Sequence, residues 1–350
     1  MTLLAVLRHL AFAAGLALVS ALVVAAMISA RVMDVPNTRS AHARPTPKGG
    51  GVGVVVAFML GVTMLYGYAD FARLADAYFR GVILAALAIA VVAFLDDLRD
   101  WPFVVKLAAQ ALAALAAAGS GLYVRSVNLP YLGAVDLGLL GLAATIGWIV
   151  FATNAMNFID GLNGLAAGTA LVAAGFLAVL SAQQDAWFAY FAALLLAGGL
   201  VGFLPFNFPR ARIFLGDVGS QFCGFMLAVL GIAAARFERV EMSFVLVPCL
   251  LSGVLFDVAF TLVRRLLAGQ RITEAHRGHL YQVAQRAGMD ARGVAMLHWG
   301  FAALGGVVCL VFVRAPSAAK PVLPLLLLIP QLLWLGVVVA RARRAGIARW

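Results

Sequence analysis

The sequence predicts an all-α integral membrane protein, a helical bundle that crosses the bilayer about 11 times. Of its 350 residues, 64% are hydrophobic and 12% are charged, which leaves too little polar surface for an ordinary soluble domain. Apolar runs of about 18 residues or more recur along the chain, and such a run can span the bilayer as a helix. The runs are continuous instead of alternating, so a membrane β-barrel is not expected.

We assign the whole chain, residues 1–350, to a single membrane domain. The expected spans cover residues 8–30, 50–68, 79–95, 103–121, 138–156, 164–181, 186–204, 218–236, 243–263, 294–314 and 321–340. The first run begins at Arg8 and continues to Ala30. It is longer than the apolar core of about 7–15 residues in a cleaved signal peptide, which favours a retained first span over that alternative.

Basic residues predict the orientation of the chain. Most of the 26 lysines and arginines fall in the odd-numbered loops between the expected spans and in the C-terminal tail. Loops rich in Lys and Arg stay on the cytoplasmic side, so we expect the N-terminus outside and the C-terminus in the cytoplasm. The net charge of +11 follows from this bias and from attraction to the anionic lipid bilayer, so no nucleic-acid partner is expected.

Five polar segments interrupt the apolar pattern, and all of them fall on the predicted cytoplasmic side. The loops that carry them cover residues 32–49, 96–106, 154–164, 205–220 and 264–293. The loops expected on the opposite side carry few residues suited to chemistry. Because polar groups beside apolar helices are costly, this one-sided distribution predicts a single composite site at the cytoplasmic surface of the membrane.

Aspartates are the first candidates for chemistry at this site. Asp96, Asp97, Asp160 and Asp217 lie in or beside apolar helices, where a lone charge is costly. Each could be a helix cap or half of an ion pair, but four acids on one face would repel one another without a cation. Oxygen ligands with no cluster of Cys or His favour Mg²⁺, or Mn²⁺ as the alternative, over zinc. Because Mg²⁺ usually binds one or two carboxylates plus substrate phosphates, a phosphate-bearing substrate is implied.

Glycine-rich and basic stretches supply candidate phosphate contacts. The clusters "KGGGVG" and "LGDVGS" each open an expected helix, where free N–H groups and the helix dipole favour anions. Glycine also allows close helix packing, so each cluster alone is a weak signal. The basic candidates are Lys48, Lys106, Arg210, Arg212, His276, Arg277 and His279.

The segment "NAMNFIDGLNG" places Asn154, Asn157, Asp160 and Asn163 three residues apart. If the segment is helical, these residues form a stripe that drifts around the helix. If its glycines break the helix, they form a loop that lines a cavity. Amides can recognise a nucleobase or a sugar, and the carboxylate can orient a metal; the alternative is hydrogen bonding between neighbouring helices.

Together the five segments resemble a known family. The matching pieces are "RSAHARPTPKGGG", "FLDD" followed by "KLAAQ", "NAMNFIDGLNGLAAG", "FLGDVGSQFCGF" and "HRGHLYQ", in order from about residue 39 to 282. They resemble the bacterial polyprenyl-phosphate N-acetylhexosamine-1-phosphate transferases of glycosyltransferase family 4 type, which include the peptidoglycan translocase. The first piece and the short C-terminal tail look closest to the branch that initiates O-antigen synthesis.

The resemblance implies a reaction and its partners. An N-acetylamino-sugar 1-phosphate would pass from a UDP-sugar to undecaprenyl phosphate, with release of UMP, on the cytoplasmic side of the bacterial inner membrane. Mg²⁺ would be required. The sugar stays open between GlcNAc, GalNAc, FucNAc and QuiNAc, as does the choice between direct attack and a covalent aspartyl intermediate. A homodimer is one alternative for the oligomeric state.

The resemblance also implies roles for individual residues. Catalytic roles fall on Asp96, Asp97, Lys106 and Asp160, and the expected metal ligands are Asp217 and Asp97. The expected substrate contacts are Thr46, Lys48, Asn154, Asn157, Arg212, His276, Arg277 and His279.

Three features depart from the family pattern or lie outside it. Asn163 stands where many members carry a second Asp, so a metal or base role is not expected there. The motif "HRGHLYQ" has fewer histidines than in other members. Asp257, two turns before Arg264 and Arg265, is interpreted as half of a structural ion pair inside the membrane.

Two other functions fit the composition. An ion-coupled transporter of a phosphorylated or anionic solute would also use carboxylates and glycine-broken helices within the membrane. It would place them near the bilayer midplane, however, and would often show internal repeats. A lipid-binding scaffold without activity is the third alternative, and the retained set of acidic residues argues against it.

Overall fold

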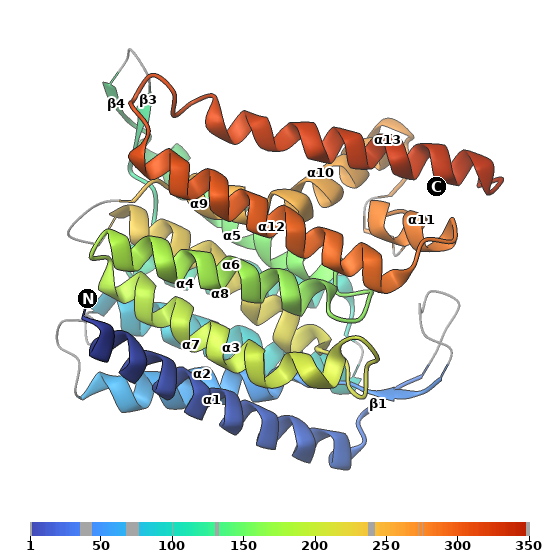
Figure 1. Cartoon of the computed structure of the whole chain (residues 1–350), viewed down its shortest axis with the longest axis horizontal. Helices are drawn as coiled ribbons and strands as arrows, with labels where there is room; N and C mark the ends of the chain where they lie inside the picture. Colours follow the sequence, from blue (N-terminus) through green and yellow to red (C-terminus); the bar gives the residue numbers. More distant parts are fainter. Residues whose placement is uncertain are drawn as a thin grey trace.

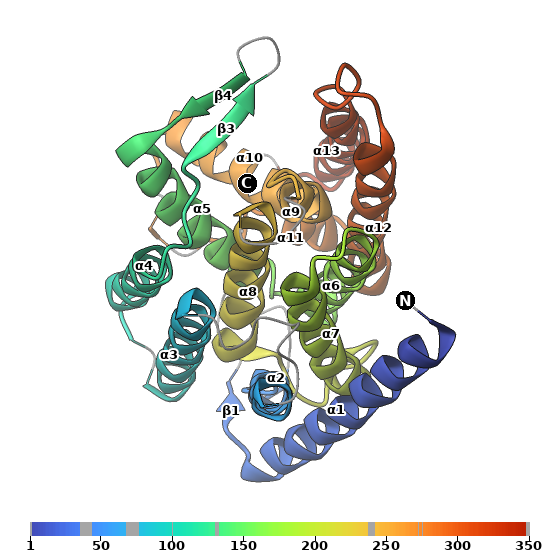
Figure 2. The same ribbon diagram turned by 90° about the vertical axis from the view of Figure 1, so that its left-hand side faces the viewer.

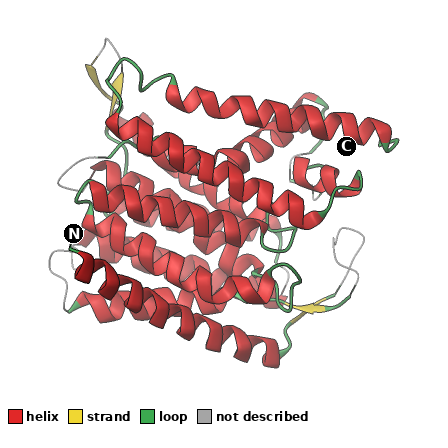
Figure 3. Ribbon diagram, viewed as in Figure 1, coloured by secondary structure: helices red, strands yellow, loops and turns green. Residues whose placement is uncertain are grey.

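The computed structural model describes residues 2–35, 44–67, 77–99, 101–129, 133–236, 242–271, 273–274 and 276–347. Parts of the predicted site loops lie outside the described residues, namely 36–43, Asp100, 272 and 275. Helices dominate the described chain, and its strands form two short antiparallel pairs (Figure 3). These pairs are β1 (Met33–Asp34) with β2 (Thr46–Pro47), and β3 (Ser126–Leu129) with β4 (Gly133–Asp136).

The helices lie side by side in a bundle (Figure 1). Their bounds are α1 (Leu3–Ala30), α2 (Gly51–Tyr66), α3 (Ala77–Arg99), α4 (Phe103–Gly119), α5 (Gly138–Phe158), α6 (Leu165–Gln183), α7 (Trp187–Asn207), α8 (Gly216–Arg236), α9 (Leu246–Leu250), α10 (Ser252–Leu267), α11 (Leu280–Arg286), α12 (Ala291–Arg314) and α13 (Leu328–Arg344), with a 3₁₀ helix η2 (Leu323–Leu327) before α13.

Within the described residues, 8 helical segments are long and apolar enough to cross a membrane, and α2 and α4 are shorter apolar helices. The predicted class of a polytopic helical membrane protein is therefore confirmed, while the number of crossings and the orientation stay predictions.

The prediction of one continuous ninth span over residues 243–263 is wrong. The chain forms the short helix α9, and at Leu251 it turns into a second helix, α10. Asp257, Thr261 and Arg265 recur at every fourth residue of α10 and are buried, whereas the opposite face carries exposed leucines. α10 is therefore an amphipathic helix whose buried face carries polar residues, which is not the pattern of a uniformly apolar span.

α8 lies at the centre of the bundle (Figure 2). It is almost entirely buried, whereas α1 and α13, at the edges, leave most of their residues exposed. The exposed residues of these outer helices are largely apolar. Such a surface fits contact with lipid tails, because the main-chain polar groups in the interior of each helix are paired within that helix.

The first turns of α2 and α8 meet beside the pocket described below. A Cβ atom built on Gly51 would lie 2.2 Å from Cα of Gly219, so only glycine permits this approach. The N–H groups of Gly50 and Gly51 donate to the carbonyl oxygens of Phe214 and Leu215, at 2.9 and 2.8 Å. These contacts hold the segment before α2 against the segment before α8, and both segments contribute side chains to the pocket.

We expect Gly51→Ala to destabilise the bundle, because the added methyl group would overlap main-chain atoms of α8. Overpacking of this kind costs about 1–3 kcal/mol, so the thermal unfolding midpoint of the detergent-purified protein should fall. Gly15→Ala is the matched control, since nothing lies within 4 Å of a Cβ built at Gly15 on α1. Equal unfolding midpoints for the two variants would contradict the close contact between α2 and α8.

Candidate active site

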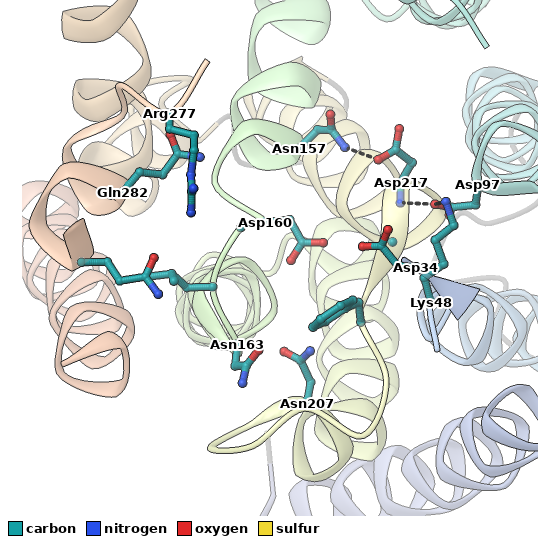
Figure 4. Close-up of a pocket in the computed structure, with 15 residues that line it drawn as sticks. Asp34, Lys48, Asp97, Asn157, Asp160, Asn163, Asn207, Asp217, Arg277 and Gln282 are labelled. Carbon is teal, nitrogen blue, oxygen red and sulfur yellow. Dashed lines mark hydrogen bonds and ion pairs between the residues drawn. The ribbon is translucent and has the colours of Figure 1, made fainter. Parts of the chain in front are cut away.

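A polar pocket lies at the ends of α3 and α5 and the start of α8 (Figure 4). Each of the five predicted site loops contributes to it. The lining residues are Asp34, Lys48, Asp97, Asn157, Asp160, Gly161, Leu162, Asn163, Asn207, Phe214, Gly216, Asp217, Arg277, Gln282 and Gln285. Segments that are far apart in the sequence therefore meet at one place, as the one-sided distribution of polar residues led us to expect.

The segment from Asn154 to Asn163 is divided between a helix and a turn. Asn154 and Asn157 lie on the last turns of α5, and Asp160 and Asn163 lie in the turn that leads to α6. Gly164 ends this turn with a φ of +73°, a conformation that glycine adopts without steric cost. The turn carries Asp160 and Asn163 into the pocket beside Asn157 and leaves Asn154 behind in the helix bundle.

Lys106 joins two of the predicted catalytic carboxylates. Its Nζ lies 2.5 Å from Oδ2 of Asp96 and 3.1 Å from Oδ2 of Asp217. Asp217 also accepts hydrogen bonds from Nδ2 of Asn157 at 2.9 Å and from Nε2 of Gln221 at 3.2 Å. A single cation therefore offsets the repulsion between two acids, and the orientation of Asp217 is held by groups from α4, α5 and α8.

Asp97 caps the N-terminus of α8 from the end of α3. Its two carboxylate oxygens accept the main-chain N–H groups of Asp217, at 3.2 Å, and Val218, at 3.1 Å. The positive end of the helix dipole favours this carboxylate, and Nζ of Lys48 lies 3.9 Å from it. Asp97 thus has both a structural role as a cap and a place in the lining of the pocket.

Asp160 lies in surroundings that disfavour its charged form. Burial raises the pKa of Asp160 well above its ordinary value, and the negative charges of Asp217 and Asp97 raise it further. A positive ion in the pocket would reverse this effect, because it would favour the ionised carboxylate. The electrostatics of the pocket therefore favour a cation between these acids.

The acids of the pocket fit a metal ion that is shared with a substrate. Within the described residues, no group of three His, Cys, Asp or Glu side chains could hold a metal by itself. Asp97, Asp160 and Asp217 nevertheless line the same pocket, and their oxygens are the ligands that Mg²⁺ and Mn²⁺ prefer. Mg²⁺ commonly binds one or two carboxylates and completes its shell with water and substrate phosphates, which suits this arrangement.

The wall opposite these acids comes from α11 and the loop before it. Arg277 and Gln282 lie across the pocket from Asp217 (Figure 4). Gln285, which belongs to α11, also lines the pocket. His276 does not line the pocket. Burial and the neighbouring His279 lower the pKa of His276 to about 4, so His276 is uncharged at neutral pH. Among the three expected substrate contacts of this loop, Arg277 alone lines the pocket, and its guanidinium is suited to binding phosphate.

His279 packs into the protein against Asp257. Its Nδ1 lies 3.1 Å from Oδ1 of Asp257, which also accepts the N–H of Leu280 at 2.9 Å, while Oδ2 accepts the N–H of Tyr281 at 3.0 Å. The structural interpretation of Asp257 fits these contacts. The structure gives Asp257 partners that the sequence did not indicate, namely His279 and the main-chain N–H groups that begin α11. The position of His279 does not support a substrate contact.

Three further expected substrate contacts lie away from the pocket lining. Asn154 is buried and donates to Gln110, so the alternative of hydrogen bonding between helices fits this residue. The hydroxyl of Thr46 donates to the carbonyl of Arg44 at 3.1 Å. Arg212 is exposed, and its guanidinium lies 5.4 Å from the ring centroid of Phe206. A direct substrate role for these three side chains is not supported by their positions.

The structure adds lining residues that the sequence did not single out as candidates. Gln282 belongs to the motif "HRGHLYQ", and Asn207 belongs to the segment "PFNFPRAR", so both were within reach of motif analysis. Asn207 is buried and braces two loops, because its Oδ1 accepts the N–H of Gly164 at 2.6 Å. Asp34 on β1 and Gln285 lie in segments without a recognisable pattern, and only the fold places them here.

Comparisons with known proteins agree with this site. The model of glycosyl transferase family 4 matches residues 79–235. A probable undecaprenyl-phosphate N-acetylglucosaminyl 1-phosphate transferase of Bacillus subtilis (strain 168) is 29% identical over 262 residues, which cover 74% of this chain and 71% of the relative. A decaprenyl-phosphate N-acetylglucosaminephosphotransferase of Mycolicibacterium smegmatis is 32% identical over 291 residues, with coverage of 75% and 70%. A phospho-N-acetylmuramoyl-pentapeptide-transferase of Lactobacillus gasseri is 30% identical over 246 residues, with coverage of 66% and 74%.

The fold and the pocket define a polytopic helical membrane protein with a carboxylate-rich site at one end of its bundle. The chain belongs to the polyprenyl-phosphate N-acetylhexosamine-1-phosphate transferases within glycosyl transferase family 4, so the resemblance seen in the sequence is confirmed.

We expect Arg277→Gln to weaken binding of a diphosphate ligand, with UDP as the probe, because Arg277 is the cation on the α11 side of the pocket lining. Loss of a hydrogen bond to a charged group should raise the Kd by about 10-fold or more, as measured by calorimetry on the detergent-purified protein. Arg212→Gln is the matched control, since that side chain lies against Phe206 outside the pocket. Equal losses in both variants would contradict this assignment.

Proposed function

We propose that this chain transfers an N-acetylamino-sugar 1-phosphate from a UDP-sugar to undecaprenyl phosphate, releasing UMP. One observation carries the proposal: Asp97, Asp160 and Asp217 line one pocket together with Lys48 and Arg277. Carboxylates that bind a divalent cation, next to basic groups that bind phosphate, suit a reaction between two anionic reactants. The names of the relatives from B. subtilis and M. smegmatis describe chemistry of this kind on undecaprenyl and decaprenyl phosphate.

The proposed transfer forms one P–O bond and breaks another. An oxygen of the lipid phosphate attacks the β-phosphorus of the UDP-sugar, and UMP leaves with the oxygen that joined the two phosphates. Lys48 and Arg277 would reduce repulsion between the reactants, and holding them in line would lower the entropic cost of reaction. A bound Mg²⁺, or Mn²⁺ in its place, would stabilise negative charge on the diphosphate, with Asp217 and Asp97 as its proposed ligands.

Direct attack by the lipid phosphate is proposed in preference to a covalent aspartyl intermediate. Asp96 is bound by Lys106 on one oxygen, and its other oxygen accepts the N–H of Trp101 at 2.8 Å. Both oxygens of Asp97 accept main-chain N–H groups at the start of α8. Oxygens that already accept hydrogen bonds are less reactive as nucleophiles, because their lone pairs are engaged. We therefore propose that Asp96 positions Lys106, which holds Asp217.

The proposed enzyme acts at the cytoplasmic surface of the bacterial inner membrane, with its N-terminus outside and its C-terminus in the cytoplasm. The bias of Lys and Arg toward the loops on the pocket side supports this orientation. Its product would initiate O-antigen or another cell-surface polysaccharide. The position of the pocket at the ends of α3, α5 and α8 argues against an ion-coupled transporter, whose binding site is expected near the bilayer midplane (Figure 1).

We expect Asp217→Asn to reduce transfer by about 100-fold or more, because a neutral amide cannot balance the charge of a metal ion. EDTA should stop the wild-type reaction, and added Mg²⁺ should restore it. UMP release by the detergent-purified protein is the measurement, with the thermal unfolding midpoint as a check on folding. Asp136→Asn, at an exposed position of β4, is the control. Full activity of Asp217→Asn would remove the metal assignment.

The reaction itself is tested with membranes that contain the protein, undecaprenyl phosphate and a panel of UDP-sugars. We expect UMP release with at least one UDP-N-acetylamino sugar, and this release should require both the lipid phosphate and Mg²⁺. Accumulation of an unchanged sugar nucleotide inside vesicles, without UMP, would support the transporter instead. Membranes that carry the Asp217→Asn variant provide the background rate.

A further inference from the structure

Three buried amides connect α5 to the carboxylate of Asp217. Nδ2 of Asn154 donates to Oε1 of Gln110 at 2.5 Å, and Nε2 of Gln110 donates to Oε1 of Gln221 at 3.0 Å. Nε2 of Gln221 then donates to Oδ2 of Asp217 at 3.2 Å. The three amides have exposed fractions of 8%, 2% and 4% in this order. We call Asn154, Gln110 and Gln221 the amide relay.

The polarity of the amide relay is fixed at both ends. The ionised carboxylate of Asp217 can only accept, so Gln221 must present its N–H to it and its carbonyl oxygen to Gln110. By the same logic Gln110 must donate to Gln221 and accept from Asn154. At the other end, Nδ2 of Asn154 also donates to the carbonyl oxygen of Val150 at 2.8 Å, and a carbonyl can only accept. Both ends therefore impose the same direction on all three amides.

The amide relay acts on the side of Asp217 that faces away from the pocket. Oδ2 of Asp217 binds Gln221 and Lys106, and neither residue lines the pocket. Oδ1 accepts from Asn157, which does line it. Fixing Oδ2 from behind therefore holds Oδ1 toward the pocket, where a ligand would meet it.

We propose that the amide relay is a positioning device that sets the affinity of Asp217 for a divalent cation. This inference rests on the proposed function, in which Asp217 is a metal ligand. Buried amides within an apolar bundle have little water with which to exchange partners, so each hydrogen bond restricts the next. Reversing Gln221 would point a carbonyl oxygen at the carboxylate, and Gln110 prevents this reversal. Asn154 in turn keeps Gln110 in its orientation.

Substitution by Met tests the amide relay, because Met fills a similar volume without the amide. Gln221→Met removes the donor to Asp217, and loss of such a supporting group typically weakens metal binding by about 10-fold. Gln110→Met leaves that donor in place and removes only its restraint, so we expect a smaller loss of about 3-fold. In the double variant the amide of Gln221 is already absent, so the loss of Gln110 has no further effect. The metal affinity of the double variant should therefore equal that of Gln221→Met alone.

The measurement is the Kd for Mn²⁺, followed by electron paramagnetic resonance on the detergent-purified full-length protein with UDP present. Gln331→Met is the matched control, because Gln331 is a buried glutamine on α13 outside the pocket; its Kd should equal that of wild type. Thermal unfolding midpoints establish that each variant is folded. If Gln221→Met does not fold, Gln110→Met decides alone, because an unchanged Kd for that variant would overturn the proposal.

Mn²⁺ binding by the Asp217→Asn variant separates this inference from the proposed function. If Asp217→Asn loses Mn²⁺ binding while the relay variants match wild type, the relay is overturned and the metal site stands. Additive losses in the double variant would also overturn it, because the two glutamines would then act independently. If Asp217→Asn binds Mn²⁺ as wild type does, the metal assignment itself fails, and the amide relay fails with it.

Discussion

The placement of several carboxylates at one end of an apolar bundle is the constraint on which this structure depends. Ionised groups in such a place need compensating charge or hydrogen bonds. Lys106 provides charge for Asp96 and Asp217, and the N-terminus of α8 provides N–H groups for Asp97. Burial and the neighbouring charges of Asp217 and Asp97 raise the pKa of Asp160. The site is therefore an acidic pocket that a cation and its phosphate ligands would stabilise.

The fold serves this constraint by close packing around α8. The glycine contact between α2 and α8 brings Lys48 to the acids, and the cap from Asp97 fixes α3 on the same helix end. On the other side, Asp257 caps α11 and anchors the wall that carries Arg277 and Gln282. The caps that Asp97 and Asp257 form on α8 and α11 thus help to determine the shape of the pocket.

Much of the fold and part of the site could be predicted from the sequence. Charged residues are scarce in this chain, so Asp97, Asp160 and Asp217 stand out, and their common side follows from the alternation of spans. The sequence did not predict the break between α9 and α10, because residues 243–263 read as one long apolar run.

Burial explains why several of the expected site residues lie away from the pocket lining. The sequence gives the type of a residue but does not show whether its side chain is already bound. His279 looks like a phosphate contact until Asp257 is found beside it. Asn154 looks like a substrate contact until Gln110 is found as its acceptor. Asp34 was missed for the converse reason, because a tertiary contact between distant segments brings an unremarkable residue into the pocket.

The most direct test of the central claim is a structure of the protein determined with Mn²⁺ and UDP, with anomalous scattering used to locate the metal. The assignment of Asp217 as a metal ligand predicts a metal peak about 2 Å from a carboxylate oxygen of Asp217, with a UDP phosphate oxygen also in the metal's shell. A peak at another place on the protein, or UDP bound in this pocket without a metal, would contradict it.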